Sequence, residues 1–202
     1  MTMRMPLHTL ISQQAMKIAV DCDRAAIRDS LVSARWDSAN FWLGLSSAVT
    51  AAIAAFAVSN GADLLAAAGA AESAKIYANV FASGMASVST ILVSILTFLA
   101  PAGKAVVYHQ FSNKYHALRD RIRSFVGIHC VDEASADELI REFKALLDEK
   151  RSIDADHPVV PERYYRAAAE KMEEKIKRNQ RIQEIEEQLE RPSGRAAEPD
   201  QH

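Results

Sequence analysis

Two long stretches without any charged residue constrain this chain more than any other feature. The first covers residues 38–62 and the second covers residues 76–103. A helix needs about 20 mostly apolar residues to cross the hydrocarbon core of a membrane. Trp36, Phe41 and Trp42 cluster at the start of the first stretch, as aromatic residues do at membrane interfaces. We therefore predict two transmembrane helices, at residues 39–59 and 80–101.

A buried helical hairpin inside a soluble protein is the alternative interpretation of these stretches. A helix at the surface of a soluble protein carries polar or charged residues on one side at every turn. Neither stretch has such a charged side, because charges occur only at their ends, for example at Asp37, Asp63 and Lys75. The pattern favours the membrane interpretation.

The distribution of lysine and arginine predicts the orientation of the two spans. The segment 60–79 between them contains only Lys75, whereas five basic residues lie in each outer flank: Arg4, Lys17, Arg24, Arg28 and Arg35 on one side, and Lys104, Lys114, Arg119, Arg121 and Arg123 on the other. Basic residues accumulate on the cytoplasmic side of a membrane. We expect a multi-pass protein of the inner (plasma) membrane with both termini in the cytoplasm.

The rest of the chain is also predicted to be helical, since glycine (7) and proline (6) are scarce for 202 residues. The expected fold class is all-α, a two-transmembrane helical hairpin with an N-terminal helix and a C-terminal cytoplasmic helical bundle. An amphipathic cytoplasmic helix is expected in residues 1–38, an extracytoplasmic loop at 60–79, cytoplasmic helices in 102–191 and a disordered tail at 192–202. Ser135 and Glu138 form a capping-box pattern at the start of one cytoplasmic helix.

The second predicted span has two different faces. One is a stripe of hydroxyl side chains spaced by three and four residues: Ser83, Ser87, Thr90, Ser94 and Thr97. The other is bulky and apolar and is expected to meet lipid: Phe81, Met85, Val88, Leu92, Ile95 and Leu99. Two interpretations of the hydroxyl stripe remain open, because such hydroxyls either bond between helices or line a polar pore.

The same heptad spacing continues past the second span as a hydrophobic seam, which consists of Tyr108, Phe111, Tyr115, Leu118, Ile122 and Phe125. It predicts one long helix over residues 80–126, with Pro101 and Gly103 as candidate hinge positions. We expect the seam to hold several copies of the chain together as a homo-oligomer.

Residues that carry chemistry are missing from the sequence. No nucleotide-binding, zinc-protease or hydrolase motif occurs, and the two cysteines, Cys22 and Cys130, lie far apart. The net charge of -2 disfavours a nucleic-acid binder. The sequence therefore predicts a protein that is not an enzyme, with no cofactor, no metal site and no nucleic-acid partner.

Several short motifs follow one another along the chain: Arg28 and Arg35-Trp36, His116-Ala117-Leu118-Arg119, a helix of the 139–154 type, Pro158-Val159-Val160-Pro161, and Tyr164-Tyr165-Arg166-Ala167. In these motifs and in the order of its elements the chain resembles the SLATT-domain proteins, which are two-transmembrane proteins associated with SMODS and SLOG domains. The resemblance implies a membrane effector of a bacterial conflict or anti-phage system that forms a pore or disrupts the membrane. It also implies a nucleotide-generating or nucleotide-sensing partner protein.

Two other functions are compatible with the same sequence. One is a non-conducting two-transmembrane adaptor whose cytoplasmic helices recruit a partner. The other is a soluble helical scaffold, which would be recovered without detergent.

Overall fold

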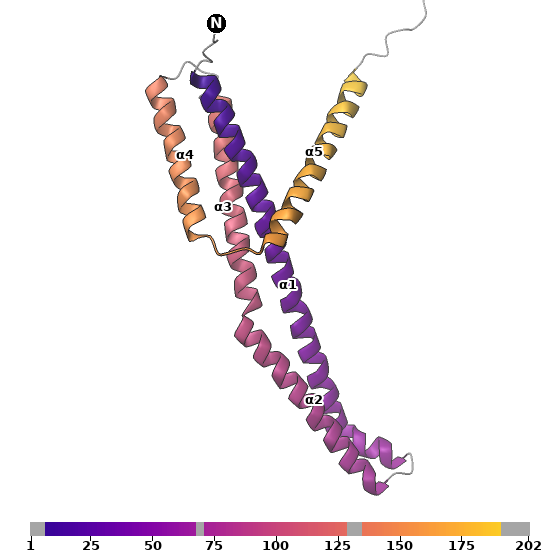
Figure 1. Ribbon diagram of the computed structural model, residues 1–202. Coiled ribbons are helices and arrows are strands. Elements are labelled where there is room, and N and C mark those ends of the chain that lie inside the picture. Colours follow the sequence, from indigo (N-terminus) through magenta and orange to yellow (C-terminus); the bar gives the residue numbers. More distant parts are fainter. Residues whose placement is uncertain (1–6, 68–70, 129–134, 191–202) are drawn as a thin grey trace, which may run out of the picture. The chain divides into compact units, whose positions relative to one another are not determined.

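The computed structural model describes residues 7–67, 71–128 and 135–190, and this part of the chain consists of helices with no strand (Figure 1). The predicted all-α class is confirmed. In chain order the helices are α1 (Leu7–Ala67), α2 (Ala71–Leu99), α3 (Pro101–Ile128), α4 (Ala136–Asp156) and α5 (Glu162–Glu190).

Helix α1 is much longer than the sequence pattern predicts. The expected amphipathic helix and the expected first span are one helix of 61 residues, because no proline interrupts the chain between Pro6 and Pro101. The predicted loop at 60–79 is also mostly helical, since α1 extends to Ala67 and α2 begins at Ala71. This segment is rich in alanine, which has the highest helix propensity of all residues. Residues 68–70 lie outside the described residues, as does the predicted disordered tail at 192–202.

The ends of α4 and the start of α5 follow local signals. Ser135 caps α4, and its side chain accepts a hydrogen bond from the backbone N–H of Glu138, as the capping-box pattern predicts. Helix α4 ends at Asp156, two residues before Pro158, and α5 begins at Glu162 directly after Pro161. A residue that precedes proline is disfavoured in a helix, which explains both boundaries.

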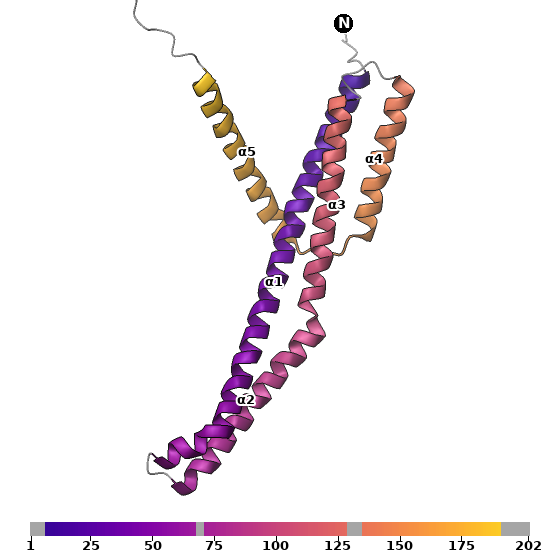
Figure 2. The same cartoon turned by 180° about the vertical axis from the view of Figure 1, so that it is seen from behind.

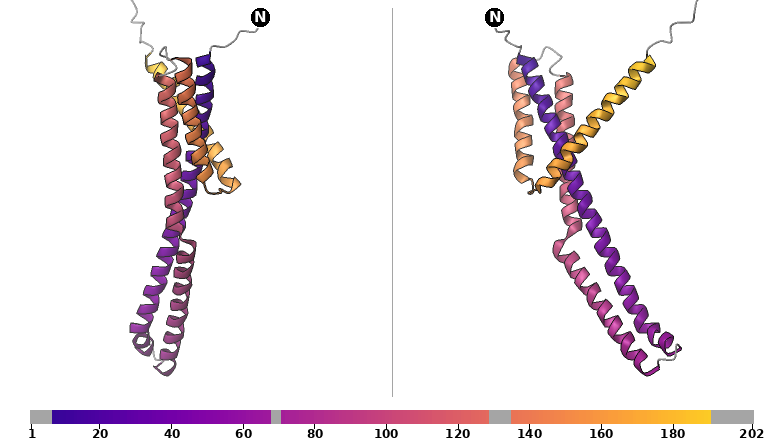
Figure 3. Two further views of the ribbon diagram at one scale, coloured as in Figure 1. Left: turned by 90° about the vertical axis from the view of Figure 1, so that its left-hand side faces the viewer. Right: turned by 45° about the vertical axis from the view of Figure 1, so that its right-hand side comes forward.

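The chain divides into two compact units, each with its own buried residues. The first unit is formed by Met1–Arg28 together with Ser112–His202. Its core combines small residues of α1 with large residues of α3, α4 and α5, and the views of Figures 1 and 3 agree that α4 lies beside α3. The rings of Phe125 in α3 and Phe143 in α4 stack at a centroid distance of 6.4 Å.

The second unit is Asp29–Phe111, which holds the C-terminal part of α1, all of α2 and the start of α3. Within it α1 and α2 run side by side (Figures 1 and 2). Near the start of α3, the hydroxyl of Ser33 in α1 donates to the backbone carbonyl of Ala105 at 2.9 Å, and the Lys104 ammonium lies 4.5 Å from the centre of the Trp36 ring. These contacts fix α1 against the first turn of α3.

Candidate functional site

The surface of the second unit is unusually apolar. Two helical stretches are long and apolar enough to cross a membrane, with mean hydropathies of 1.8 and 1.9 in their most apolar windows. Only 17% and 6% of these windows are buried. A core helix of a soluble protein has the same composition but is mostly buried, whereas Phe56, Ile91 and Phe98 here are all exposed. The apolar stretches therefore present their side chains to the surroundings.

Small and hydroxyl side chains make the contact between α1 and α2. The hydroxyl of Ser89 donates to the backbone carbonyl of Ser47 at 3.1 Å, and the two hydroxyls are 3.4 Å apart. Both side chains are buried, as are four alanines on the same two helices: Ala54, Ala57, Ala78 and Ala82. Small residues let two helix backbones approach closely. In lipid, where no hydrophobic effect drives helix association, this close packing holds helices together. Ser89 lies outside the predicted hydroxyl stripe, so the sequence pattern missed the serine that meets α1.

The predicted hydroxyl stripe lies on the opposite, exposed side of α2. Ser83, Ser87, Thr90, Ser94 and Thr97 are all exposed. Four of them donate to a carbonyl one turn earlier in the same helix: Ser87 to Ser83, Thr90 to Ala86, Ser94 to Thr90 and Thr97 to Val93, at 2.8–2.9 Å. Their hydroxyls are thus satisfied within α2, while their oxygen atoms retain a free lone pair that can accept a further hydrogen bond.

The apolar stripe of α2 is split between two environments. Phe81, Val88 and Ile95 are exposed, as expected for side chains that meet lipid. Met85, Leu92 and Leu99 are half-buried instead, so the expectation that the whole stripe meets lipid is wrong for these three. They share the buried side of α2 with Ala82 and Ser89, because residues spaced by three and four fall on one face of a helix.

A break separates α2 from α3, where the sequence pattern predicts one long helix with a kink at Pro101. Ala100 lies between them in the left-handed conformation, with φ of 43°. Pro101 disfavours a right-handed helical conformation at the residue before it and has no N–H to donate, so it starts a new helix. The N–H of Ala100 donates to the carbonyl of Leu96 at 3.1 Å, and the carbonyl of Ala100 accepts from the N–H of Lys104 at 3.2 Å. These bonds satisfy one backbone group at the end of α2 and one at the start of α3. Gly103 is an ordinary residue of the first turn of α3, so the special backbone geometry lies at Ala100.

Ala100→Gly is expected to raise the free energy of unfolding by about 0.5–1 kcal/mol, because glycine adopts a positive φ without the strain that alanine carries there. Gly103→Ala is a matched change three residues away. This change is expected to raise the free energy of unfolding by about 1 kcal/mol, because alanine favours a helix more than glycine does. The new Cβ would meet no atom within 4 Å. Thermal unfolding of the full chain in detergent, followed by circular dichroism, measures both. A lower midpoint for Ala100→Gly would contradict the assigned backbone.

The hydrophobic seam is part of the internal core of the chain. Its six residues are all buried within a single copy: Tyr108, Phe111, Tyr115, Leu118, Ile122 and Phe125. Tyr108 and Phe111 belong to the second unit, and the other four belong to the first. A side chain that is buried in its own chain has no surface left for a second copy. The seam therefore cannot serve as the contact between copies that the sequence pattern suggested.

A buried carboxylate holds three helices of the first unit together. Asp23 of α1 accepts hydrogen bonds from Arg119 of α3 at 2.7 Å and from Lys175 of α5 at 2.5 Å, and its side chain is only 2% exposed. Burial by itself raises the pKa of Asp23, but the hydrogen bonds from Lys175 and Arg119 outweigh it and hold the pKa below its usual range. Nearby, burial lowers the pKa of His116 and the charge of Arg119 lowers it further. Nδ1 of His116 is buried and has no hydrogen-bond partner among the described residues.

A second polar cluster surrounds a cavity of about 290 Å³ in the same unit. The Arg28 guanidinium is 2.7 Å from Nε2 of His157 and 4.9 Å from the centre of the Tyr165 ring. The Tyr115 hydroxyl and the Lys150 ammonium donate to Asp154 at 2.7 Å and 2.6 Å. Burial raises the pKa of Asp154, but these two donors outweigh it and lower the pKa overall. These contacts tie the end of α4 and the start of α5 to α1 and α3.

The described residues offer little for covalent or metal chemistry. Burial raises the pKa of the Cys22 thiol to about 11, so it is protonated and unreactive at neutral pH. No group of three or more histidine, cysteine, aspartate or glutamate side chains within the described ranges could hold a metal ion. Cys130 lies outside those ranges.

Comparison with known proteins adds no assignment, since no family model, no curated protein and no solved structure matches this chain.

Proposed function

We propose that this chain is a two-span membrane effector that permeabilises the membrane when several copies assemble around the exposed hydroxyl face of α2. The proposal is based on two apolar stretches with few buried residues, one of which carries a hydroxyl stripe on its outer side. For an isolated pair of helices in lipid, an exposed hydroxyl stripe makes no favourable contact with the surrounding lipid tails. Several copies that turn this stripe toward one another would enclose a polar path.

In this proposal residues 39–59 and 80–101 cross the membrane as a hairpin and both flanks lie in the cytoplasm. The positive-inside bias supports the orientation, because five basic residues flank each span on one side and only Lys75 lies between the spans. The Lys104 ammonium above the Trp36 ring supports the position of the boundary, since lysine and tryptophan are the residues that anchor helices at a membrane interface. Both side chains lie at the cytoplasmic ends of the proposed spans.

The resemblance to SLATT-domain proteins gives the proposal its biological context, an effector of a bacterial conflict or anti-phage system in the inner membrane. A nucleotide-generating or nucleotide-sensing partner would supply the trigger. The chain would act without catalysis, and its output would be loss of the membrane potential.

The test is the membrane potential of bacteria in which the chain is expressed, followed with a potential-sensitive dye and compared with leakage from proteoliposomes of the purified chain. The proposal predicts recovery in the membrane fraction. It also predicts depolarisation within minutes of induction, because the high copy number of the overexpressed chain drives assembly by mass action without the trigger. Recovery in the soluble fraction would overturn the membrane assignment. Membrane recovery without dye response or vesicle leakage would instead favour a non-conducting adaptor, the second candidate, for which the exposed C-terminal part of α5 provides a surface.

A further inference from the structure

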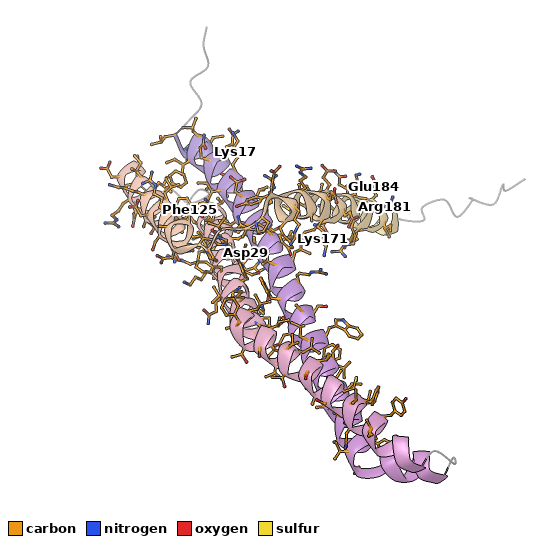
Figure 4. The ribbon with its side chains drawn as sticks, turned by 60° about the horizontal axis from the view of Figure 1, so that its bottom comes forward. Lys17, Asp29, Phe125, Lys171, Arg181 and Glu184 are labelled. Carbon is orange, nitrogen blue, oxygen red and sulfur yellow. The ribbon has the colours of Figure 1, made fainter. Side chains whose placement is uncertain are left out.

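Among its described side chains, helix α5 contacts the rest of the first unit through its N-terminal half. Ala168 and Met172 are buried, Tyr165 lies against Arg28, and Lys175 reaches Asp23. From Ile176 to Glu187 every side chain is exposed. Figure 4 shows Lys171 near the crossing with α1, and Arg181 and Glu184 farther out along α5. The exposed part of the helix contributes nothing to the core.

This exposed part carries an apolar strip that no described residue covers. Ile182 and Ile185 are 46% and 55% exposed, and they are one turn apart on one face. Leu189 continues the spacing in the sequence. Ile176 is equally exposed at 47% but lies on the opposite side of the helix. Water-exposed isoleucines on a charged helix are typical of a helix that pairs with another helix.

The charges on the same part of α5 are separated into two blocks. Lys177, Arg178 and Arg181 form a basic block, and Glu184, Glu186 and Glu187 form an acidic block directly after it. None of these six charges forms an ion pair with another described residue. Two copies of α5 in parallel would place like charges together, whereas two antiparallel copies would place each basic block against the acidic block of the other.

We propose that the exposed part of α5 pairs with the same part of a second copy of this chain, in antiparallel orientation, with Ile182 and Ile185 at the centre. The pairing is isologous, because the same patch is used by both copies. It rests on α5 alone and not on the membrane activity proposed above. It gives the cytoplasmic region a contact between copies that the buried seam cannot provide.

The test uses single cysteines in the full chain, purified in neutral detergent after both natural cysteines have been replaced by alanine. A short bismaleimide is expected to join two copies through Ile182→Cys, and not through the equally exposed Ile176→Cys on the other side. The matched pair controls for exposure and for any contact that brings the chains together elsewhere. Equal yields at the two positions, or no product at Ile182→Cys, would overturn the proposal.

Charge reversal tests the partner and the orientation. Lys177→Glu with Arg178→Glu and Arg181→Glu makes the segment acidic throughout, and Glu184→Lys with Glu186→Lys and Glu187→Lys makes it basic throughout. Each triple variant alone is expected to lose the Ile182→Cys product, and a mixture of the two is expected to regain it. The six-fold reversal is expected to pair with itself but not with the unreversed chain. Cross-linked products that contain one six-fold variant and one unreversed chain would show parallel pairing. A product yield that the triple reversals leave unchanged would rule out charge-guided pairing.

Discussion

Ser87→Leu together with Ser94→Leu is expected to reduce depolarisation to the level of cells without the protein. The two positions lie one heptad apart on the exposed hydroxyl stripe of α2, and leucine would replace two hydrogen-bonding groups by bulky apolar ones. A polar path lined by this stripe would become narrower and lose its affinity for water. The measurement is dye response per amount of chain in the membrane fraction.

Folding of the double variant is expected to be intact. Both hydroxyls are exposed, and among the described residues they bond to carbonyls of their own helix, so the substitutions remove no hydrogen bond to α1. Leucine also favours insertion of a helix into the membrane. The control is Val88→Leu with Ile95→Leu, two changes at the same spacing on the neighbouring exposed apolar face. Equal depolarisation by both double variants and by the wild type would show that the hydroxyl stripe lines no conducting path.

Asp23→Ala is expected to lower the free energy of unfolding by about 3 kcal/mol, since Arg119 would keep only the largely exposed Asp120 as a partner and Lys175 would lose its carboxylate partner. The Arg119 side chain is only 16% exposed, so it cannot be fully hydrated after the loss. Lys175→Met is the control and is expected to cost about 1 kcal/mol, because the pair between Asp23 and Arg119 remains. Thermal or detergent-induced unfolding of the full chain measures both.

The effect of Asp23→Ala is expected to depend on pH with a defined sign. The folded chain holds the pKa of Asp23 below its usual value of 3.8, so the carboxylate contributes stability above that pH. The contribution is lost as the pH falls through the folded-state pKa. The difference between wild type and Asp23→Ala is therefore constant near neutral pH and shrinks below about pH 4. A difference that persists unchanged in acid would show that Asp23 acts through packing and not through its charge.

The sequence predicts the helical class and the apolar stretches well, because periodicity and charge-free length are local properties. The cap at Ser135 and the start of α5 at Glu162 follow from neighbouring residues in the same way. The candidate hinges, Pro101 and Gly103, lie one and three residues after the observed break at Ala100, because proline changes the conformation of the residue before it.

The sequence pattern could not predict which helices contact one another. A heptad stripe shows which residues share a face but not what covers that face. Tyr115 and Leu118 were therefore assigned to a contact between copies, although both side chains are buried within a single copy. Asp23 and Arg119 are 96 positions apart, and no local signal connects them. Ser89 differs from the serines of the stripe only by its angle around α2.

Access of water to the two neighbouring faces of α2 decides whether the hydroxyl stripe lines a polar path. Thr90→Cys lies on the hydroxyl stripe and Ile91→Cys on the adjacent apolar face, and both wild-type side chains are exposed. A charged, membrane-impermeant thiol reagent would be added to depolarised cells that express either variant without the natural cysteines. If the hydroxyl stripe lines the path, the reagent modifies Thr90→Cys and blocks the leak, while Ile91→Cys stays unmodified in lipid. No modification of Thr90→Cys, or equal modification of both, would contradict a polar path lined by the hydroxyl face of α2.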